Sequence, residues 1–203
     1  QLGLGDTNHR GDAANEMGSN LGFVDLGTGR TATAISVWSS SCAILDNASV
    51  KCWGNNDSGQ LGLGDTNHRG DAANEMGDNL PIVDLGTGRT ATVISGGSAH
   101  NCAILDNGFV KCWGYNGYGQ LGIDSSTEIG DDSGEMASLP GINLGTGRTA
   151  TAIAAGTFHT CALLDNTSVK CWGDNDRGQL GIDNNTEMGK TSGSMAQLLG
   201  IDL

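Results

Sequence analysis

A thirteen-residue stretch with two cysteines occurs three times and constrains the fold more than any other feature of the chain. The copies span 42–54, 102–114 and 161–173, and each one ends in Cys-Trp-Gly. In the first copy, two short apolar runs flank Asp46-Asn47-Ala48-Ser49. Asp and Asn favour turns because they tolerate left-handed backbone and bond their own main chain. The pattern therefore predicts an antiparallel hairpin in each copy.

The spacing of the cysteines fits a disulfide across each hairpin. With the turn centred on Asn47, Ile44 lies opposite Val50 and Cys42 lies opposite Cys52. Directly opposed residues share a face and have close Cβ atoms, which suits a disulfide and matches no zinc-ligand spacing. All six cysteines are used in this way, which predicts the bonds Cys42–Cys52, Cys102–Cys112 and Cys161–Cys171. Such bonds need an oxidising compartment, so we expect a secreted or extracellular protein.

The rest of the sequence repeats with the same period. Gln-Leu-Gly begins at positions 1, 60, 120 and 179, and residues 1–18 are identical to 60–77. A period near 60 residues indicates a propeller or repeat array with four strands in each unit. The strands expected in the first unit are 32–37, the two hairpin strands, and an edge strand at 80–85 that contains Pro81.

These units divide the whole chain, for which we predict an all-β propeller of four-stranded antiparallel blades. We expect three complete blades at 27–85, 86–144 and 145–203. Residues 1–26 resemble the long loop and last strand of a preceding blade. Because the first three strands of that blade are missing, we expect a unit that assembles with other chains into a ring or fibre, a piece of a longer array, or a boundary that falls inside one closed propeller.

The charge of the chain is strongly negative and unevenly placed. The net charge is −13, and 17 of the 23 acids lie in 1–26, 60–85, 120–144 and 179–203. The long loops should therefore form an acidic face, which would repel nucleic acid and attract cations or a basic partner. No apolar run approaches the length of a membrane span.

The repeated motifs resemble those of the regulator of chromosome condensation repeat family. The matching pattern is His159 to Leu164, then Val-Lys-Cys-Trp-Gly at 169–173, then Gly-Gln-Leu-Gly at 178–181. The resemblance covers essentially the whole chain and implies a seven-bladed propeller. It is closest to cysteine-containing, secreted members. The family's founder is a nuclear exchange factor for a small GTPase, but the cysteines and acidic loops argue against that role here.

Several residues are candidates for binding or modification. Oxygen ligands for a loosely bound calcium ion are available from Asp65, Asp71 and Glu75, although their spacing is not that of an EF-hand. Sequons for N-glycosylation occur at Asn47, Asn56, Asn166 and Asn184. We expect no other cofactor.

Other recurring residues are expected to be structural. Trp53, Trp113 and Trp172 end a strand in each unit, where core packing is favoured over a platform for sugars. His100 and His159 lack a paired nucleophile. Arg30, Arg89 and Arg148 follow Gly-Thr-Gly, and we expect them to bond carbonyls between blades.

No catalytic constellation emerges, so we predict that the protein is not an enzyme. The favoured function is structural or protein recognition, including self-assembly into a ring or filament. The alternatives are a lectin or ligand-binding propeller that uses the acidic loops, and, less favoured, a GTPase regulator.

Overall fold

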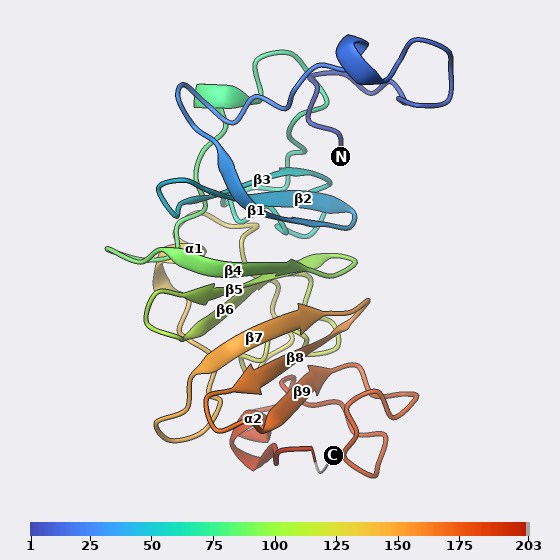
Figure 1. Cartoon of the computed structure of the whole chain (residues 1–203). Coiled ribbons are helices and arrows are strands. Elements are labelled where there is room, and N and C mark those ends of the chain that lie inside the picture. The colour runs from blue at the N-terminus through green and yellow to red at the C-terminus, as the bar shows by residue number, and fades with distance from the viewer. Residues whose placement is uncertain (202–203) are drawn as a thin grey trace.

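The computed structural model describes residues 1–201 and contains three antiparallel sheets that are stacked one upon another (Figure 1). Each sheet has three strands in sequence order. The strands are β1 (Ala32–Val37), β2 (Ser40–Leu45), β3 (Val50–Gly54), β4 (Ala91–Gly96), β5 (His100–Leu105), β6 (Val110–Gly114), β7 (Ala150–Ala155), β8 (His159–Leu164) and β9 (Val169–Gly173). The predicted all-β class is confirmed.

The hairpin register is the one that the sequence predicts. In the first sheet Cys42 lies opposite Cys52 and Ile44 lies opposite Val50. The same pairing recurs between β5 and β6 and between β8 and β9. The first strand also occupies the predicted range 32–37, with an irregular register near its start. Turn chemistry and cysteine spacing were therefore sufficient to determine local strand pairing.

The predicted fourth strand is not a regular strand in the structure. Residues 81–85 have no strand assignment, although the Val83 amide donates to the Val50 carbonyl at 2.9 Å. Val83 and Leu85 are buried and Ile82 is exposed, so the segment is extended and alternates between the core and solvent. Pro81 has no amide hydrogen to donate, which limits the ladder that this segment can form with β3.

The core lies between consecutive sheets because alternate residues of each second strand face opposite ways. Cys42 and Ile44 of β2 pack against the second sheet, in a cluster that includes Ile94 and Trp113. Ala43 and Leu45 face the other way, toward Val24 and other residues of the N-terminal segment. The second and third sheets enclose an equivalent cluster. The β2 strand is covered by the second sheet on one face and by the N-terminal segment on the other, and β5 is covered by the sheets on either side, which explains why both strands are buried along their whole length.

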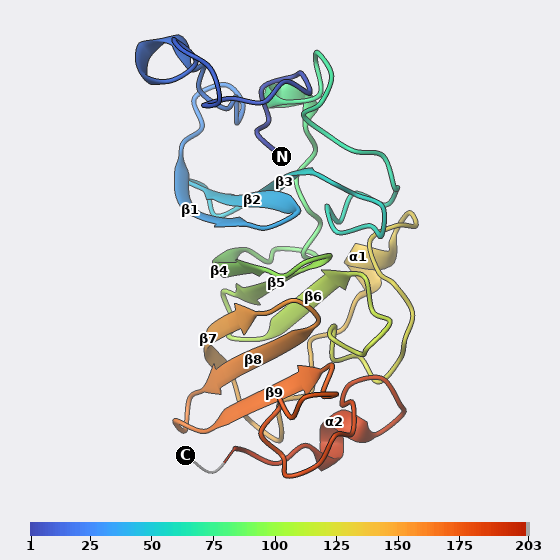
Figure 2. The same ribbon diagram turned by 90° about the vertical axis from the view of Figure 1, so that its right-hand side faces the viewer.

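The long loops after β3, β6 and β9 lie to one side of the stacked sheets, whereas residues 1–26 lie at the end of the stack, beyond the first sheet (Figure 2). Each of these four segments contains a short helix. Two of these helices are 3-10 turns, at Gly18–Asn20 and Gly77–Asn79. The other two are α1 (Glu135–Ser138) and α2 (Ser194–Gln197). Within residues 1–201, no helix has the length and apolar character that crossing a membrane requires. Acid-rich long loops therefore lie beside the sheets, but the acid-rich residues 1–26 lie at the end of the stack, so these segments do not all share the one face that the charge distribution predicts.

Candidate functional site

The cysteines meet within each sheet in the predicted pairs. The two sulfur atoms are 2.12 Å apart in the first pair, 2.07 Å in the second and 2.02 Å in the third. No cysteine is left free. The first two pairs are fully buried by the sheet that follows them. The first two pairs lie within the contacts between consecutive repeats, where they contribute apolar surface as well as a covalent link.

A carbonyl–tryptophan hydrogen bond joins each repeat to the one before it. The indole nitrogens of Trp53, Trp113 and Trp172 each donate to a glutamine carbonyl at 3.0 Å. The acceptors are the glutamines of the preceding Gln-Leu-Gly turns, Gln1, Gln60 and Gln120. Trp113 and Trp172 are completely buried, and Trp53 nearly so. This confirms core packing, and it leaves these rings unavailable as a platform for sugars.

Residues 1–26 contact the first sheet as the later long loops contact theirs. The Gln1 carbonyl accepts from Trp53 and from the Ser41 hydroxyl. The Gln120 carbonyl accepts from Trp172 and from the Thr160 hydroxyl in the same way. The N-terminal segment therefore makes the contacts of a preceding repeat's long loop.

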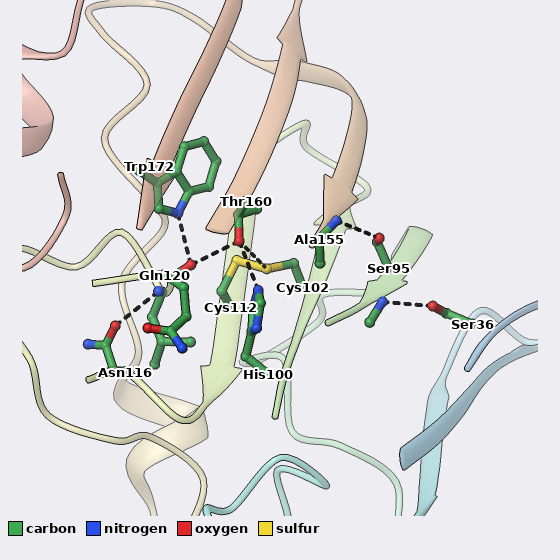
Figure 3. Close-up of a disulfide and its surroundings, with 12 residues drawn as sticks. Ser36, Ser95, His100, Cys102, Cys112, Asn116, Gln120, Ala155, Thr160 and Trp172 are labelled. Carbon is green, nitrogen blue, oxygen red and sulfur yellow. Dashed lines mark hydrogen bonds between the residues drawn. A yellow bond between two sulfur atoms is a disulfide. The ribbon is translucent and has the colours of Figure 1, made fainter. Parts of the chain in front are cut away.

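His100 lies inside the contact between the second and third sheets (Figure 3). Its Nε2 is 2.9 Å from the Thr160 hydroxyl, which donates its own hydrogen to the Gln120 carbonyl. Nε2 must therefore carry the imidazole proton, while the buried Nδ1 has no hydrogen-bond partner. Burial, with a smaller contribution from His159, lowers the pKa of His100 from 6.5 to about 4.

Serine hydroxyls link the first strands of successive sheets. The Ser36 hydroxyl accepts from the Gly96 amide at 2.7 Å, and the Ser95 hydroxyl accepts from the Ala155 amide at 3.0 Å (Figure 3). These bonds connect β1 to β4 and β4 to β7, which lie one above another in the stack. These bonds fix the relative position of the repeats and leave the loops free to differ.

A buried asparagine organises each long loop, which the sequence analysis missed. Asn56 accepts from the Leu61 amide and donates to the carbonyls of Asp65 and Asn67. Asn116 and Asn175 make the same contacts in their repeats. The prediction that Asn56 is a glycan acceptor is therefore wrong for the folded chain, because its amide is fully buried and engaged.

The other three sequons lie on exposed parts of the surface. Asn47 and Asn166 occupy the tips of the first and third hairpins, where each side-chain oxygen accepts from the amide two residues further on. Asn184 is exposed in the last long loop. The equivalent tip in the second repeat has Phe109 instead of serine, so it has no sequon. Glycosylation at these exposed sites stays a prediction.

The candidate calcium ligands have other partners. Asp65 pairs with Arg69 at 2.7 Å, and one oxygen of Glu75 accepts from three backbone amides, those of residues 70–72. Asp71 is exposed. Among residues 1–201, the group of acids close enough to share one ion is a different one, Asp174, Asp176 and Glu187. The structure therefore does not assemble Asp65, Asp71 and Glu75 around a common point, and calcium binding stays a prediction.

The arginines after Gly-Thr-Gly do not link blades as expected. Arg30, Arg89 and Arg148 each form an ion pair with an aspartate at the tip of a hairpin in the same repeat, at 3.2, 3.2 and 3.4 Å. The partners are Asp46, Asp106 and Asp165. The expectation was wrong because hairpin pairing brings this turn aspartate beside the start of the first strand.

An aromatic cluster on the loop side was also missed. The rings of Tyr115, Tyr118 and Phe158 lie with centroids 5.1 to 6.3 Å apart, and each residue is half-buried. The Lys190 ammonium lies 6.0 Å from the Tyr118 ring centre. The first two residues come from the second repeat, and Phe158 and Lys190 come from the third. The sequence could have indicated the cluster, because these four positions carry residues that differ from those at the same positions of the other repeats.

Comparison with known proteins identifies the family. Models of the regulator of chromosome condensation (RCC1) repeat match residues 49–104 and 107–163, and residues 36–60, 92–120 and 150–179. More than half of the chain is matched, so the chain belongs to the RCC1 repeat family.

Its curated relatives are much longer proteins. The human protein named probable E3 ubiquitin-protein ligase HERC6 is 32% identical over 142 residues, which are 70% of this chain and 12% of the relative. The regulator of chromosome condensation of Drosophila melanogaster is 31% identical over 131 residues, which are 64% of this chain and 21% of the relative. The chain thus spans a small part of the relatives it matches.

Solved structures share the fold. Human WBSCR16 superposes with a TM-score of 0.66 at 17% identity, over 88% of this chain and 42% of that one. Yeast RCC1, solved bound to Kap60, gives a TM-score of 0.61 at 20% identity, over 86% of this chain and 36% of that one. The stacked sheets are therefore the arrangement of RCC1-type propellers.

Proposed function

We propose that this chain is a non-catalytic recognition segment of an extracellular β-propeller. The observation that carries the proposal is the set of three cysteine pairs at bonding distance, one in each sheet. Disulfides of this kind persist in oxidising compartments. They hold a scaffold whose long loops gather on one side, and loops on a rigid scaffold are the usual carriers of binding function.

The partner that fits this scaffold best is another protein with a basic surface. The chain carries a net charge of −13, and 17 of its 23 acids lie in the segments 1–26, 60–85, 120–144 and 179–203. That field favours association with a positively charged surface and disfavours nucleic acid. Yeast RCC1, which shares the fold, was solved with a protein partner.

In this proposal each repeat is a four-stranded blade with the divisions 27–85, 86–144 and 145–203, while 1–26 belongs to a preceding blade. The extended segment 80–85 serves as the fourth strand of the first blade, beside β3. Its support is the bond from the Val83 amide to the Val50 carbonyl and the alternating burial of its side chains. The end of the last unit, 202–203, lies outside the described residues.

We also propose that another repeat of the same kind covers the outer face of β1. Ile35 is 68% exposed, whereas Ile94, which holds the same position in β4, is 7% exposed because the first sheet covers it. Val37, two residues further along β1, is also exposed, and so is the neighbouring Trp38. A further repeat, from a second copy or from a longer polypeptide, would bury this face as the internal sheets bury theirs.

Sedimentation velocity tests the assembly. The chain should associate as its concentration rises, and Ile35→Asp should return it to a monomer. Thr92→Asp, at an exposed position of β4, is the matched control and should associate like the wild type. A monomer at all concentrations would exclude assembly of this chain through β1.

Peptide mapping of disulfide bonds tests whether the protein belongs in an oxidising, extracellular compartment. Protein recovered from a secretory host without reducing agent should yield Cys42–Cys52, Cys102–Cys112 and Cys161–Cys171 as its cross-linked peptides. In the same experiment, glycosidase treatment should reduce the mass if Asn47 and Asn166 carry glycans. Free thiols in the secreted protein would contradict the extracellular assignment.

A further inference from the structure

Four residues that break the repeat pattern come together at one place in the fold. Tyr115 and Tyr118 replace Asn55 and Ser58 of the first repeat, whereas Phe158 and Lys190 replace Ala99 and Asp131 of the second. They come from two repeats and are separated by up to 75 positions in sequence, yet they form one surface cluster. Changes that were independent of one another would be scattered over the array.

The change to Tyr115 leaves a buried hydrogen-bond donor without a partner. In the first and third repeats, the residue at this position accepts a hydrogen bond from the glutamine of the following turn: Asn55 from Gln60, and Asp174 from Gln179. Tyr115 provides no such acceptor, and Nε2 of the fully buried Gln120 has no partner. An unpaired buried donor is destabilising, and proteins retain such local faults mainly at functional sites.

A second change accommodates the tyrosine. Gly117 occupies a position that is Asp57 in the first repeat and Asp176 in the third. A Cβ atom at Gly117 would collide with the Tyr115 hydroxyl. In this turn an aspartate has been replaced by glycine, which makes room for the ring of Tyr115. The substitutions at 115 and 117 therefore support the same placement of the tyrosine.

Carboxylates adjoin the aromatic cluster on the side of the third repeat. The Asp174 amide donates to the Phe158 carbonyl, and the carboxylates of Asp174, Asp176 and Glu187 have oxygens within 4.8 Å of one another. Glu187 binds Lys190 at 2.7 Å. Even with Arg177 on the same turn, these side chains carry more negative than positive charge.

We propose that the aromatic cluster and these carboxylates together bind an arginine-bearing segment of a partner protein. A guanidinium group stacks on aromatic rings and forms paired hydrogen bonds with carboxylates, so it suits both halves of the surface. Lys190 already makes a weaker contact of this kind within the chain, over Tyr118 and against Glu187. Tyrosine and arginine are also the residues that dominate the energetics of protein interfaces. This inference rests on the proposed recognition function.

The chain contains only two tyrosines, so ring-labelled tyrosine reports this site directly in an NMR titration. The probe is a blocked peptide of alternating glycine and arginine, and the comparison peptides carry glutamate or serine in place of arginine. We expect the arginine peptide to shift both tyrosine signals saturably and the others to shift neither. A methyl glycoside serves as a further probe; saturable binding of the sugar without binding of the peptide would overturn the proposal in favour of carbohydrate recognition.

Variants taken from the chain's own repeats provide matched controls. Tyr118→Ser copies Ser58 and should weaken binding about tenfold, as followed through the remaining tyrosine. Lys190→Asp copies Asp131, removes the competing cation, and should strengthen binding severalfold. If the two variants bound the arginine peptide with the same affinity, the proposal would be overturned.

Stability provides an independent measurement. Tyr115→Asn copies Asn55 and gives Gln120 an acceptor, so its Tm should rise while peptide affinity falls. A lower Tm would mean that Tyr115 is retained for folding, and the proposal would fail. Because the sedimentation and mapping experiments do not involve this surface, failure here would leave the extracellular recognition function standing.

Discussion

His100 should make the contact between the second and third repeats sensitive to mild acid. Its imidazole is fully buried and neutral, and burial lowers its pKa to about 4 from the ordinary 6.5. As the pH falls, the unfolded chain therefore binds this proton before the folded chain does. The stabilisation is fully present above pH 6.5 and is lost as the pH falls from 6.5 toward 4.

The magnitude follows from the difference between the two pKa values. From pH 7 to pH 5, the linkage relation gives a loss of about 2 kcal/mol, and the full loss below pH 4 is about 3 kcal/mol. This is a substantial part of the stability of an ordinary domain. The physical cause is that burial disfavours the charged imidazole, and a protonated Nδ1 would also find no partner in the buried contact.

The measurement is urea denaturation, followed by tryptophan fluorescence, of the wild type and His100→Ser at several pH values between 7 and 4.5. Serine is the residue that the first repeat has at this position, Ser40. Both proteins carry the same carboxylates, so these cancel in the difference between the two curves. We expect the advantage of the wild type to shrink by about 2 kcal/mol between pH 7 and pH 5. A difference that stays constant over this range would refute the reasoning.

Four further predictions concern stability and ions. Trp113→Ala should lower the free energy of unfolding by about 3–5 kcal/mol, because it removes a fully buried ring, and a loss near zero in urea denaturation would contradict the interface described above. Replacing Cys161 and Cys171 together by alanine should lower it by about 2–3 kcal/mol, because the bond closes a short loop in the unfolded chain, and thermal melting should show the same decrease. Glu75→Ala should lower it by about 1–2 kcal/mol, because three loop amides lose a charged acceptor. If the principal role of Glu75 is to accept hydrogen bonds from those amides, millimolar calcium should leave the melting temperature of the wild type unchanged. A rise in melting temperature that a chelator reverses would restore the calcium assignment.

The sequence predicted the parts of the fold that local rules determine. The hairpin register follows from the turn residues around Asn47 and from the two cysteines, and the first strand follows from its small and β-branched residues. A regular fourth strand was predicted at 80–85 from the alternation of apolar residues. The alternation is present in the structure, but Pro81 and sparse hydrogen bonding keep the segment irregular.

The candidate site was harder to predict because its contacts join distant residues. Asn56 is a sequon in the sequence, and only the folded loop shows that its amide holds the carbonyls at 65 and 67. The pairing of Arg30 with Asp46 depends on how the hairpin lies beside the first strand. For Tyr115 and Phe158, the departure from the repeat was visible in the sequence, but their proximity was not.

The cross-links have a consequence for how such a chain can change in evolution. Each disulfide joins residues ten positions apart within one repeat, while neighbouring repeats are joined by contacts such as Trp113 with Gln60. A recombination event that adds or removes one whole period therefore leaves every cysteine with its partner and the tryptophan of every Cys-Trp-Gly with a glutamine carbonyl. In the new protein, the native partner of each cysteine would still be the one ten positions away in its own repeat. The identity of residues 1–18 with 60–77 is what such recent duplication would leave in the sequence.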